Sequence, residues 1–167
     1  MGGYLNMVIK VEDDIKSPEI LQNMEKLQTK IEKNDEIKLS FSIADIVKQM
    51  HKSIEDDNPI YETIPESQGK VNNLFTVYSM SGNEDDFSTI MNEDYSKGLI
   101  NVRLSSVSTE VANNIVKKTE EQISNIFSDS SKIKITGILV VLRDMATLLV
   151  KSSFLNIFSA IIFIFFI

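Results

Sequence analysis

The 167-residue chain contains no cysteine, only one histidine, and fewer basic than acidic residues. Without cysteine, neither a disulfide framework nor a metal site built from thiolates can form, although this assigns no redox compartment. The sequence also has no glycine-rich loop of the kind that holds phosphate groups. These absences remove the usual signatures of disulfide-stabilised, thiolate-metal and phosphate-loop proteins.

Basic residues are fewer than acidic residues. The 17 Lys and Arg residues are outnumbered by 24 Asp and Glu residues, which gives a formal net charge of -7. The lysines are scattered, and most have an acidic residue within one helical turn. Because phosphate backbones are bound by clustered Lys and Arg side chains, we expect no nucleic-acid partner.

Candidate catalytic and metal-binding groups are equally sparse. His51 lies between Met50 and Lys52 on an amphipathic segment, and no spacing supplies it with a nucleophile or an orienting acid. We therefore expect an exposed surface histidine. The acidic clusters 55–57 and 83–86 lack the alternating spacing of an EF-hand, so roles in turns and at helix ends are expected. The sequence predicts no enzyme, with no catalytic residue, no metal ligand and no cofactor.

The two ends of the chain contrast with each other. Residues 1–4 lack the basic and apolar regions of a signal peptide, so an extracytoplasmic body would need an upstream segment to carry it. Residues 154–167 are uncharged and apolar, but the run is shorter than the roughly 20 residues needed to cross a bilayer core. A buried core helix and a tail anchor are alternatives. The lack of a polar face favours a third interpretation, in which residues 154–167 are the first part of a truncated transmembrane helix. Arg143, Asp144 and Lys151 would then lie at the membrane surface, where the chain approaches the bilayer.

Apolar residues alternate in four segments, which predicts four short strands. These segments are 4–11, 37–41, 100–104 and 133–135. Between the first two, and again between the last two, apolar residues have helical spacing behind a capping residue, Ser17 in one case and Ser108 or Thr109 in the other. Two strand–helix–strand units predict an α+β fold of the ferredoxin-like split βαβ type, with an antiparallel sheet and helices on one face.

The expected organisation has five parts, with a helical subdomain inserted between the two units. The inserted helices would cover an end or edge of the sheet. The parts are 1–41 (first βαβ unit), 42–96 (helical insertion), 97–137 (second βαβ unit), 138–153 (helix approaching the membrane) and 154–167 (start of the truncated transmembrane helix).

Three helices are expected within the insertion, each with an apolar inner face. The inner face of the first is formed by Ile43, Ile46, Val47, Met50 and Ile54. The second is capped by Ser67 and carries Val71, Leu74, Phe75 and Tyr78. The third, short helix follows Gly82-Asn83 and carries Phe87, Ile90 and Met91.

Aromatic and methionine side chains of the insertion are candidate ligand contacts, because such side chains adapt to irregular apolar ligands. The candidate residues are Phe75, Tyr78, Met80, Phe87 and Met91. The alternative is that each of them packs in the core of the domain.

Short segments spread over nearly the whole chain carry a resemblance to a known family. They are Met1-Gly2-Gly3, Ser17-Pro18-Glu19-Ile20-Leu21, Ile64-Pro65-Glu66-Ser67, Leu74-Phe75-Thr76-Val77-Tyr78, Asp94-Tyr95-Ser96-Lys97, Asn101-Val102-Arg103-Leu104 and Thr136-Gly137. In order and spacing they resemble the RND superfamily of exporters, and most closely its MMPL-like and archaeal predicted-exporter branch. Ser17 stands where that family more often has aspartate.

The resemblance implies an extracytoplasmic porter domain at the cell membrane, between the first and second transmembrane helices of a longer exporter. Such domains capture a hydrophobic or amphiphilic small molecule or lipid and pass it outward. The implied partners are that molecule, the membrane, the rest of the transporter chain and, as a further option, a second copy in a homo-oligomer. Alone, this stretch would not transport. The alternative function is a membrane-anchored scaffold whose helical insertion binds another protein.

Overall fold

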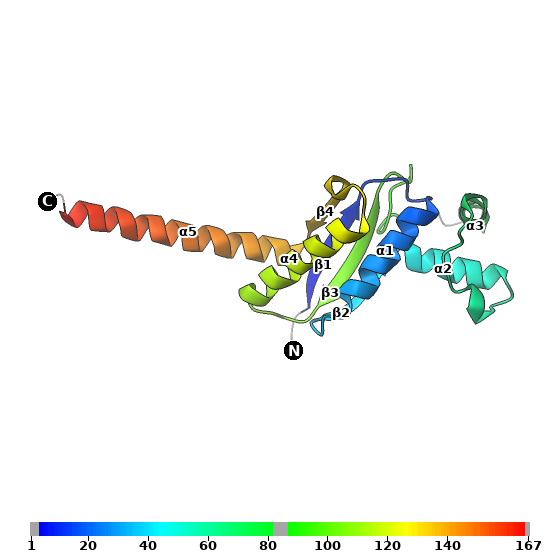
Figure 1. The fold of residues 1–167 in the computed structure, drawn as a ribbon, viewed down its shortest axis with the longest axis horizontal. Helices are drawn as coiled ribbons and strands as arrows, with labels where there is room; N and C mark the ends of the chain where they lie inside the picture. Colours follow the sequence, from blue (N-terminus) through cyan, green and yellow to red (C-terminus); the bar gives the residue numbers. More distant parts are fainter. Residues whose placement is uncertain (1–3, 82–86, 166–167) are drawn as a thin grey trace.

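The computed structural model describes residues 4–81 and 87–165. Within this part of the chain, an antiparallel sheet of four strands has the order β2-β3-β1-β4. The strands are β1 (Leu5–Val11), β2 (Ile37–Ser42), β3 (Gly98–Leu104) and β4 (Ile133–Thr136). The helices α1 (Pro18–Ile31) and α4 (Thr109–Ile126) lie over one face of this sheet (Figure 1). The predicted α+β class and the antiparallel sheet are confirmed.

The two covering helices begin where the sequence places them. Pro18 occupies the first turn of α1 behind Ser17, because its fixed φ suits a helix start. Ser108 precedes α4, and its hydroxyl accepts a hydrogen bond from the Val111 N–H at 3.4 Å. Each helix turns one apolar stripe towards the sheet. The buried apolar residues of these stripes are Leu21, Met24, Leu27, Ile31, Ala112, Ile115, Val116 and Ile123.

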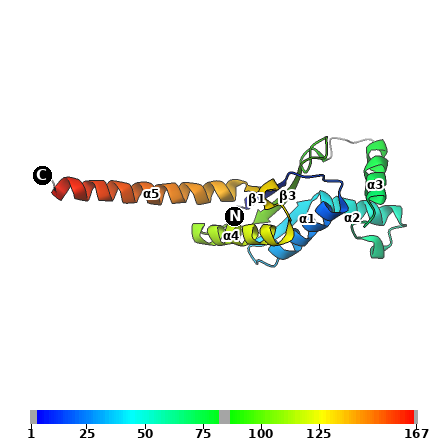
Figure 2. The same cartoon turned by 45° about the horizontal axis from the view of Figure 1, so that its top comes forward.

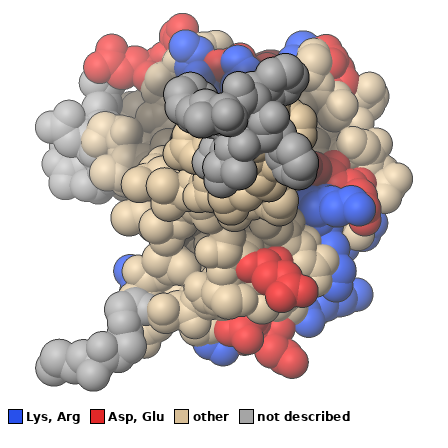
Figure 3. Space-filling model, turned by 90° about the vertical axis from the view of Figure 1, so that its left-hand side faces the viewer, with Lys and Arg blue, Asp and Glu red and all other residues tan. Residues whose placement is uncertain are grey.

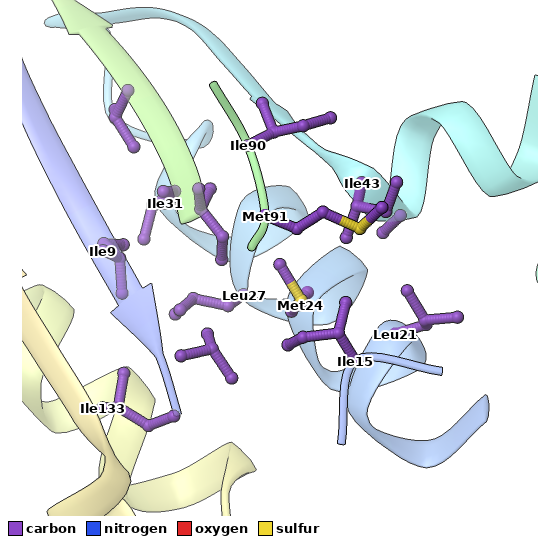
Figure 4. Close-up of a cluster of buried hydrophobic side chains, with 14 of the residues drawn as sticks. Ile9, Ile15, Leu21, Met24, Leu27, Ile31, Ile43, Ile90, Met91 and Ile133 are labelled. Atoms are coloured by element: carbon purple, nitrogen blue, oxygen red, sulfur yellow. The ribbon is translucent and has the colours of Figure 1, made fainter. Parts of the chain in front are cut away.

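The main core lies between these helices and the sheet. Alternate residues of the two central strands point into it, and Figure 4 shows Ile9 of β1 beside Leu27 of α1. The inward residues of the central strands are Met7, Ile9, Val11, Ile100, Val102 and Leu104, each at most 2% exposed. Alternation in the sequence therefore predicts both the central strands and their buried faces.

The edge strand β2 departs from the predicted alternation of buried apolar residues. Its register against β3 shifts between Ile37 and Leu39, where a bulge or irregularity interrupts the pairing. A one-residue slip sends every following side chain to the other face of a sheet. As a result Leu39 and Phe41 are 54% and 41% exposed, whereas the intervening Ser40 is buried. The strand was predicted correctly, but its apolar side chains do not all share one face.

The outer edge of β2 is protected by carboxylates. The Ser40 N–H donates to Glu32 at 2.9 Å, and the Ser42 N–H donates to Asp45 at 3.0 Å. Exposed edge strands otherwise offer free backbone donors to other chains. Because these two donors are occupied, strand addition at this edge is disfavoured.

The insertion contains α2 (Ile43–Ile54), the short 3₁₀ helix η1 (Pro59–Tyr61) and α3 (Gln68–Ser81). Among the described residues, the third helix expected here is limited to one turn over 87–91, in which the Ile90 and Met91 N–H groups donate to the Phe87 carbonyl, and it ends in a bridge between Met91 and Gly98. The Leu99 N–H donates to the Ile90 carbonyl at 2.7 Å, so this segment is held as an extension of the sheet. The expected break at Gly82-Asn83 lies outside the described residues.

The helix α5 (Ile138–Phe165) projects from the body at the end opposite α2 and α3 (Figures 1 and 2). Its 28 residues correspond to about 42 Å of helix. The first turns are attached to the body through buried Leu139 and through a 3.8 Å ion pair between Arg143 and Glu120. Across the described residues, no helix has both the length and the apolar content needed to cross a membrane.

The start of α5 depends on Gly137, which has a φ of +104°. A Cβ there would lie 2.9 Å from the Asn6 carbonyl oxygen. Replacing Gly137 by alanine is therefore expected to lower the free energy of unfolding by about 1–3 kcal/mol, measured by chemical denaturation. The matched control is Gly69→Ala in α3, where the nearest atom is 3.6 Å away. That change should leave stability unchanged or raise it by up to about 1 kcal/mol; equal losses at both positions would contradict the account.

Candidate functional site

The apolar residues of α2 lie along one stripe, but the core covers only part of it. Ile43 and Val47 are fully buried. Ile46 and Met50 are partly buried and pack against the core, whereas Ile54, the last residue of the helix, is 54% exposed. The predicted inner face therefore holds except at Ile54.

Ile46, Met50 and Ile54, along one edge of this stripe, form part of one wall of an open groove of about 630 Å³. The other wall is α3, and Phe41 of β2 also lines the groove. The lining residues are Phe41, Asp45, Ile46, Gln49, Met50, Ser53, Ile54, Leu74, Val77 and Tyr78. Most of this lining is apolar, and its volume is within the range typical of small-molecule sites.

A second, smaller cavity of about 190 Å³ lies on the other side of α3. Four aromatic rings surround it: Phe75, Tyr78, Phe87 and Tyr95. The Phe75 ring meets Phe87 at 65° and Tyr95 at 75°, with centroids 6.4 and 5.4 Å apart. The Tyr78 and Phe87 rings are 4.3 Å apart and inclined by 31°. We call this cavity the aromatic pocket.

A polar turn holds Tyr95 at the aromatic pocket. Tyr95 has a φ of +58°, a conformation that non-glycine residues rarely adopt. The turn is closed by the Lys97 N–H donating to the Asn92 side chain at 2.7 Å, and by the Ser96 hydroxyl donating to Asp94 at 2.7 Å. These bonds from the Ser96 hydroxyl and backbone N–H lower the pKa of the Asp94 carboxyl.

The ammonium group of Lys16 lies over the same rings. Its Nζ is 3.4 Å from the Tyr95 ring centroid and 5.6 Å from that of Phe75. Aromatic faces attract cations because their π-electron density is negative. Lys16 therefore makes a close cation–π contact with Tyr95 and a more distant one with Phe75.

His51 is not the exposed residue that the sequence predicts, because it is 5% exposed. It shares the inward stripe of α2 with Ile43 and Val47. Its Nδ1 is 2.8 Å from the Thr63 carbonyl oxygen, and its ring meets that of Tyr61 edge to face at 5.4 Å. Among the described residues, its Nε2 is the buried side-chain atom without a hydrogen-bond partner. Through these contacts His51 holds α2 against η1 and the segment that follows it.

The structure brings together four of the five predicted ligand contacts. Phe75, Tyr78, Phe87 and Met91 all line the aromatic pocket. Three of them, Phe75, Phe87 and Met91, also belong to the core, at 3–8% exposure. Met80 is 81% exposed and lies outside both cavities as their described lining residues define them.

Sequence reasoning missed the groove and Tyr95. The sequence carries no distinct signal for the groove, because Ile46, Met50 and Ile54 fall on the same face of α2 as Ile43 and Val47. An aromatic residue between acidic and polar turn residues, as in Asp94-Tyr95-Ser96, is a weak signal for Tyr95. Neither pattern indicates which distant segments the side chains meet.

The described residues include no group of three or more His, Asp or Glu side chains placed to hold a metal ion. The arrangement instead offers apolar surface, aromatic faces and exposed carboxylates. Such an arrangement is suited to binding. No family model, curated protein or solved structure matches the chain.

Proposed function

We propose that the chain is a membrane-attached, ligand-handling domain of the porter type found in RND-superfamily exporters. In this proposal α5 enters the membrane and the body lies on the extracytoplasmic side of the cell membrane. The groove and the aromatic pocket receive a hydrophobic or amphiphilic small molecule or lipid. The rest of a transporter chain supplies the energy, and the domain itself is not an enzyme.

The exposed apolar surface of α5 is the observation that carries the proposal. Among its described side chains, thirteen large apolar ones are each at least 43% exposed. Consecutive residues such as Leu148, Leu149 and Val150 are all exposed, so apolar side chains surround the helix. Figure 3, viewed along α5, shows charged side chains mainly towards the rim of this end. Water contact at so much apolar surface is unfavourable, and a lipid environment removes it.

The strand order supports the porter assignment at the level of topology. The antiparallel order β2-β3-β1-β4 is the order expected when two βαβ units interleave as in a ferredoxin-like fold, and it supports that part of the proposal. The two strand–helix–strand patterns in the sequence predict this fold. Many unrelated functions share the fold, so the membrane helix and the ligand cavities carry the functional argument.

The position of the groove favours a second candidate function. The groove between α2 and α3 lies at the end of the body away from α5 (Figures 1 and 2). A ligand taken directly from the bilayer would reach this end last. A membrane-anchored scaffold that binds another protein far from the membrane surface would use such a groove directly, because open apolar grooves also accept helices.

Binding of an apolar fluorescent dye tests the ligand-handling function at the groove. We expect saturable binding that the variant Ile54→Ser weakens about tenfold, since burying an isoleucine side chain contributes about 1.5–3 kcal/mol. The matched control is Ile60→Ser, because Ile60 is 77% exposed and is not among the residues lining the groove. Dye titrations of the full chain in an uncharged maltoside detergent measure both variants.

Two outcomes would speak against ligand handling. Equal dye affinity for Ile54→Ser and Ile60→Ser would place the dye elsewhere. Absence of saturable binding, together with self-association that Ile54→Ser abolishes, would support the scaffold function instead.

A further inference from the structure

We propose that the groove between α2 and α3 binds a basic amphipathic helix of another protein. This inference rests on the second candidate function, protein binding at the groove, and it names the chemistry of the partner. Three features support a partner of this kind: the apolar lining of the groove, the carboxylates beside it, and the ion pairs that engage the nearby lysines.

The lining of the groove is long and apolar. On α2 it extends from Asp45 to Ile54, so this side is about 14 Å long, or two and a half turns of helix. The helix α3 contributes Leu74, Val77 and Tyr78, which share one helix face. Because the groove is open along α2, it can receive apolar side chains that recur every three or four residues on a partner helix.

Carboxylates lie beside this lining. From α2 to α3 the insertion contains six Asp and Glu residues and three lysines, which gives a local balance of -3. The charged residue in the lining itself is Asp45. Asp57 Oδ1 is 3.5 Å from the Ser53 hydroxyl, and Glu62 accepts a hydrogen bond from the Gln49 side chain at 2.8 Å. Because Ser53 and Gln49 both line the groove, negative charge lies along its border.

The lysines of the insertion are already engaged with carboxylates. The pairs are Lys48–Glu25 at 2.9 Å, Lys52–Glu62 at 2.9 Å and Lys70–Glu55 at 3.2 Å. Asp56 and Asp57 are exposed next to Ile54, and they form no ion pair with another described residue. Their charge is therefore available to a partner, and lysine or arginine on the partner helix supplies its complement.

Charge also separates the basic helix from other occupants of the groove. An acidic helix would be repelled by the carboxylates, and a neutral helix would gain nothing from them. A second copy of the chain, bound through the same surface about a twofold axis, would place two acidic regions against each other. A basic amphipathic helix gains from both the apolar lining and the negative border.

The test is fluorescence anisotropy of a labelled helical peptide of about 14 residues, roughly four turns. The peptide has leucines at intervals of three and four residues and lysines on its opposite face, and its twin has glutamate in place of each lysine. Both are titrated with the full chain at low salt in uncharged maltoside detergent, and binding to empty micelles is subtracted. We expect the lysine peptide to bind at least about tenfold more tightly, and this preference to fall at high salt.

The first pair of variants tests the charge. Asp56→Asn together with Asp57→Asn should lower the preference for the lysine peptide about fivefold. Both positions have a positive φ, which asparagine also accepts. The matched control, Glu110→Gln together with Glu121→Gln, removes two exposed charges from α4, outside the groove. It should leave the preference within about twofold of the unchanged chain.

The second pair of variants tests the apolar lining. Val77→Ser should weaken binding of the lysine peptide about fivefold, because Val77 lines the groove and is 55% exposed. Val111→Ser makes the same chemical change at another exposed valine, on α4 and outside the groove. Its affinity for the peptide should equal that of the unchanged chain.

Equal binding of the two peptides would overturn the inference, because the carboxylates would then play no part. A preference that the two double variants reduce equally would refute it too, since net charge alone would explain that result. Equal effects of Val77→Ser and Val111→Ser would place the peptide outside the groove, again contrary to the proposal. Self-association that Val77→Ser abolishes, without peptide binding, would assign the groove to a second copy instead.

The dye titration distinguishes this inference from the proposed ligand-handling function. Dye binding that depends on Ile54, without a preference for the lysine peptide, refutes the basic partner and leaves ligand handling standing. A lysine preference that depends on Val77, without saturable dye binding, supports the basic partner and refutes ligand handling.

Discussion

Replacing Phe158 by lysine is expected to lower the partition of the full chain onto phospholipid vesicles about 100-fold. Phe158 is 64% exposed on α5, and its neighbours along the helix are also exposed and apolar. If this part of α5 lies in the bilayer core, a lysine there costs about 3 kcal/mol, which corresponds to a factor of about 100. Flotation of the protein with vesicles of zwitterionic phospholipid measures the bound fraction.

The matched control places the same charge on the body. Leu39→Lys alters another exposed apolar side chain, on the outer face of β2. Its vesicle partition should equal that of the unchanged chain. Equal loss of binding in both variants, or none in either, would mean that α5 does not enter the bilayer and that its apolar surface is covered by protein instead.

Leu27→Ala is expected to have the largest effect on stability. Leu27 is fully buried where α1 meets the sheet, and it lies close to Ile9 in Figure 4. Removing a buried leucine side chain costs about 2–5 kcal/mol, because transfer energy is lost and a cavity remains. Chemical denaturation of the chain in detergent measures the free energy of unfolding.

Leu39→Ala is the matched control, since it makes the same chemical change on the edge strand. With 54% of Leu39 exposed, the loss should stay below about 0.5 kcal/mol. A loss above about 2 kcal/mol would show that Leu39 points into the core, contrary to the register shift after Ile37.

The central part of the fold follows from the sequence because its patterns are local. Alternation in β1 and β3 predicts strands, and spacing of three and four residues in α1 predicts a buried stripe. The sequence also predicts that Gly137 ends β4, and this glycine has the positive φ that a sharp change of chain direction requires. These elements bury one face each, so one periodic pattern determines both the element and its orientation.

The remaining differences arise where tertiary structure overrides a local pattern. The shifted register in β2 turns Leu39 and Phe41 outward, and alternation alone cannot reveal such a shift. His51 is buried because the segment after η1 folds over α2, a contact between residues twelve positions apart. The expected third helix is limited to a single turn over residues 87–91, because Ile90 and Asn92 then bond to Leu99 and Lys97 beside the start of β3.

The candidate site was predictable in its composition but not in its geometry. Aromatic residues in the insertion indicate ligand contacts, and Phe75, Tyr78 and Phe87 do meet at one cavity. Tyr95 joins them only because the turn that follows Met91 returns to α3. The groove exists because Ile46, Met50 and Ile54 are only partly covered, which the packing of whole helices decides.

Attachment of α5 to the membrane is the central claim, and the absence of cysteine permits a direct measurement. Single cysteines at Ser159 on α5 and at Ser128 on the body, both exposed, can each carry an environment-sensitive fluorophore. On phospholipid vesicles, the label at Ser159 should shift to shorter wavelength and be shielded from an aqueous quencher, while the label at Ser128 stays fully quenchable. Equal quenching at both positions in the presence of vesicles would contradict the claim.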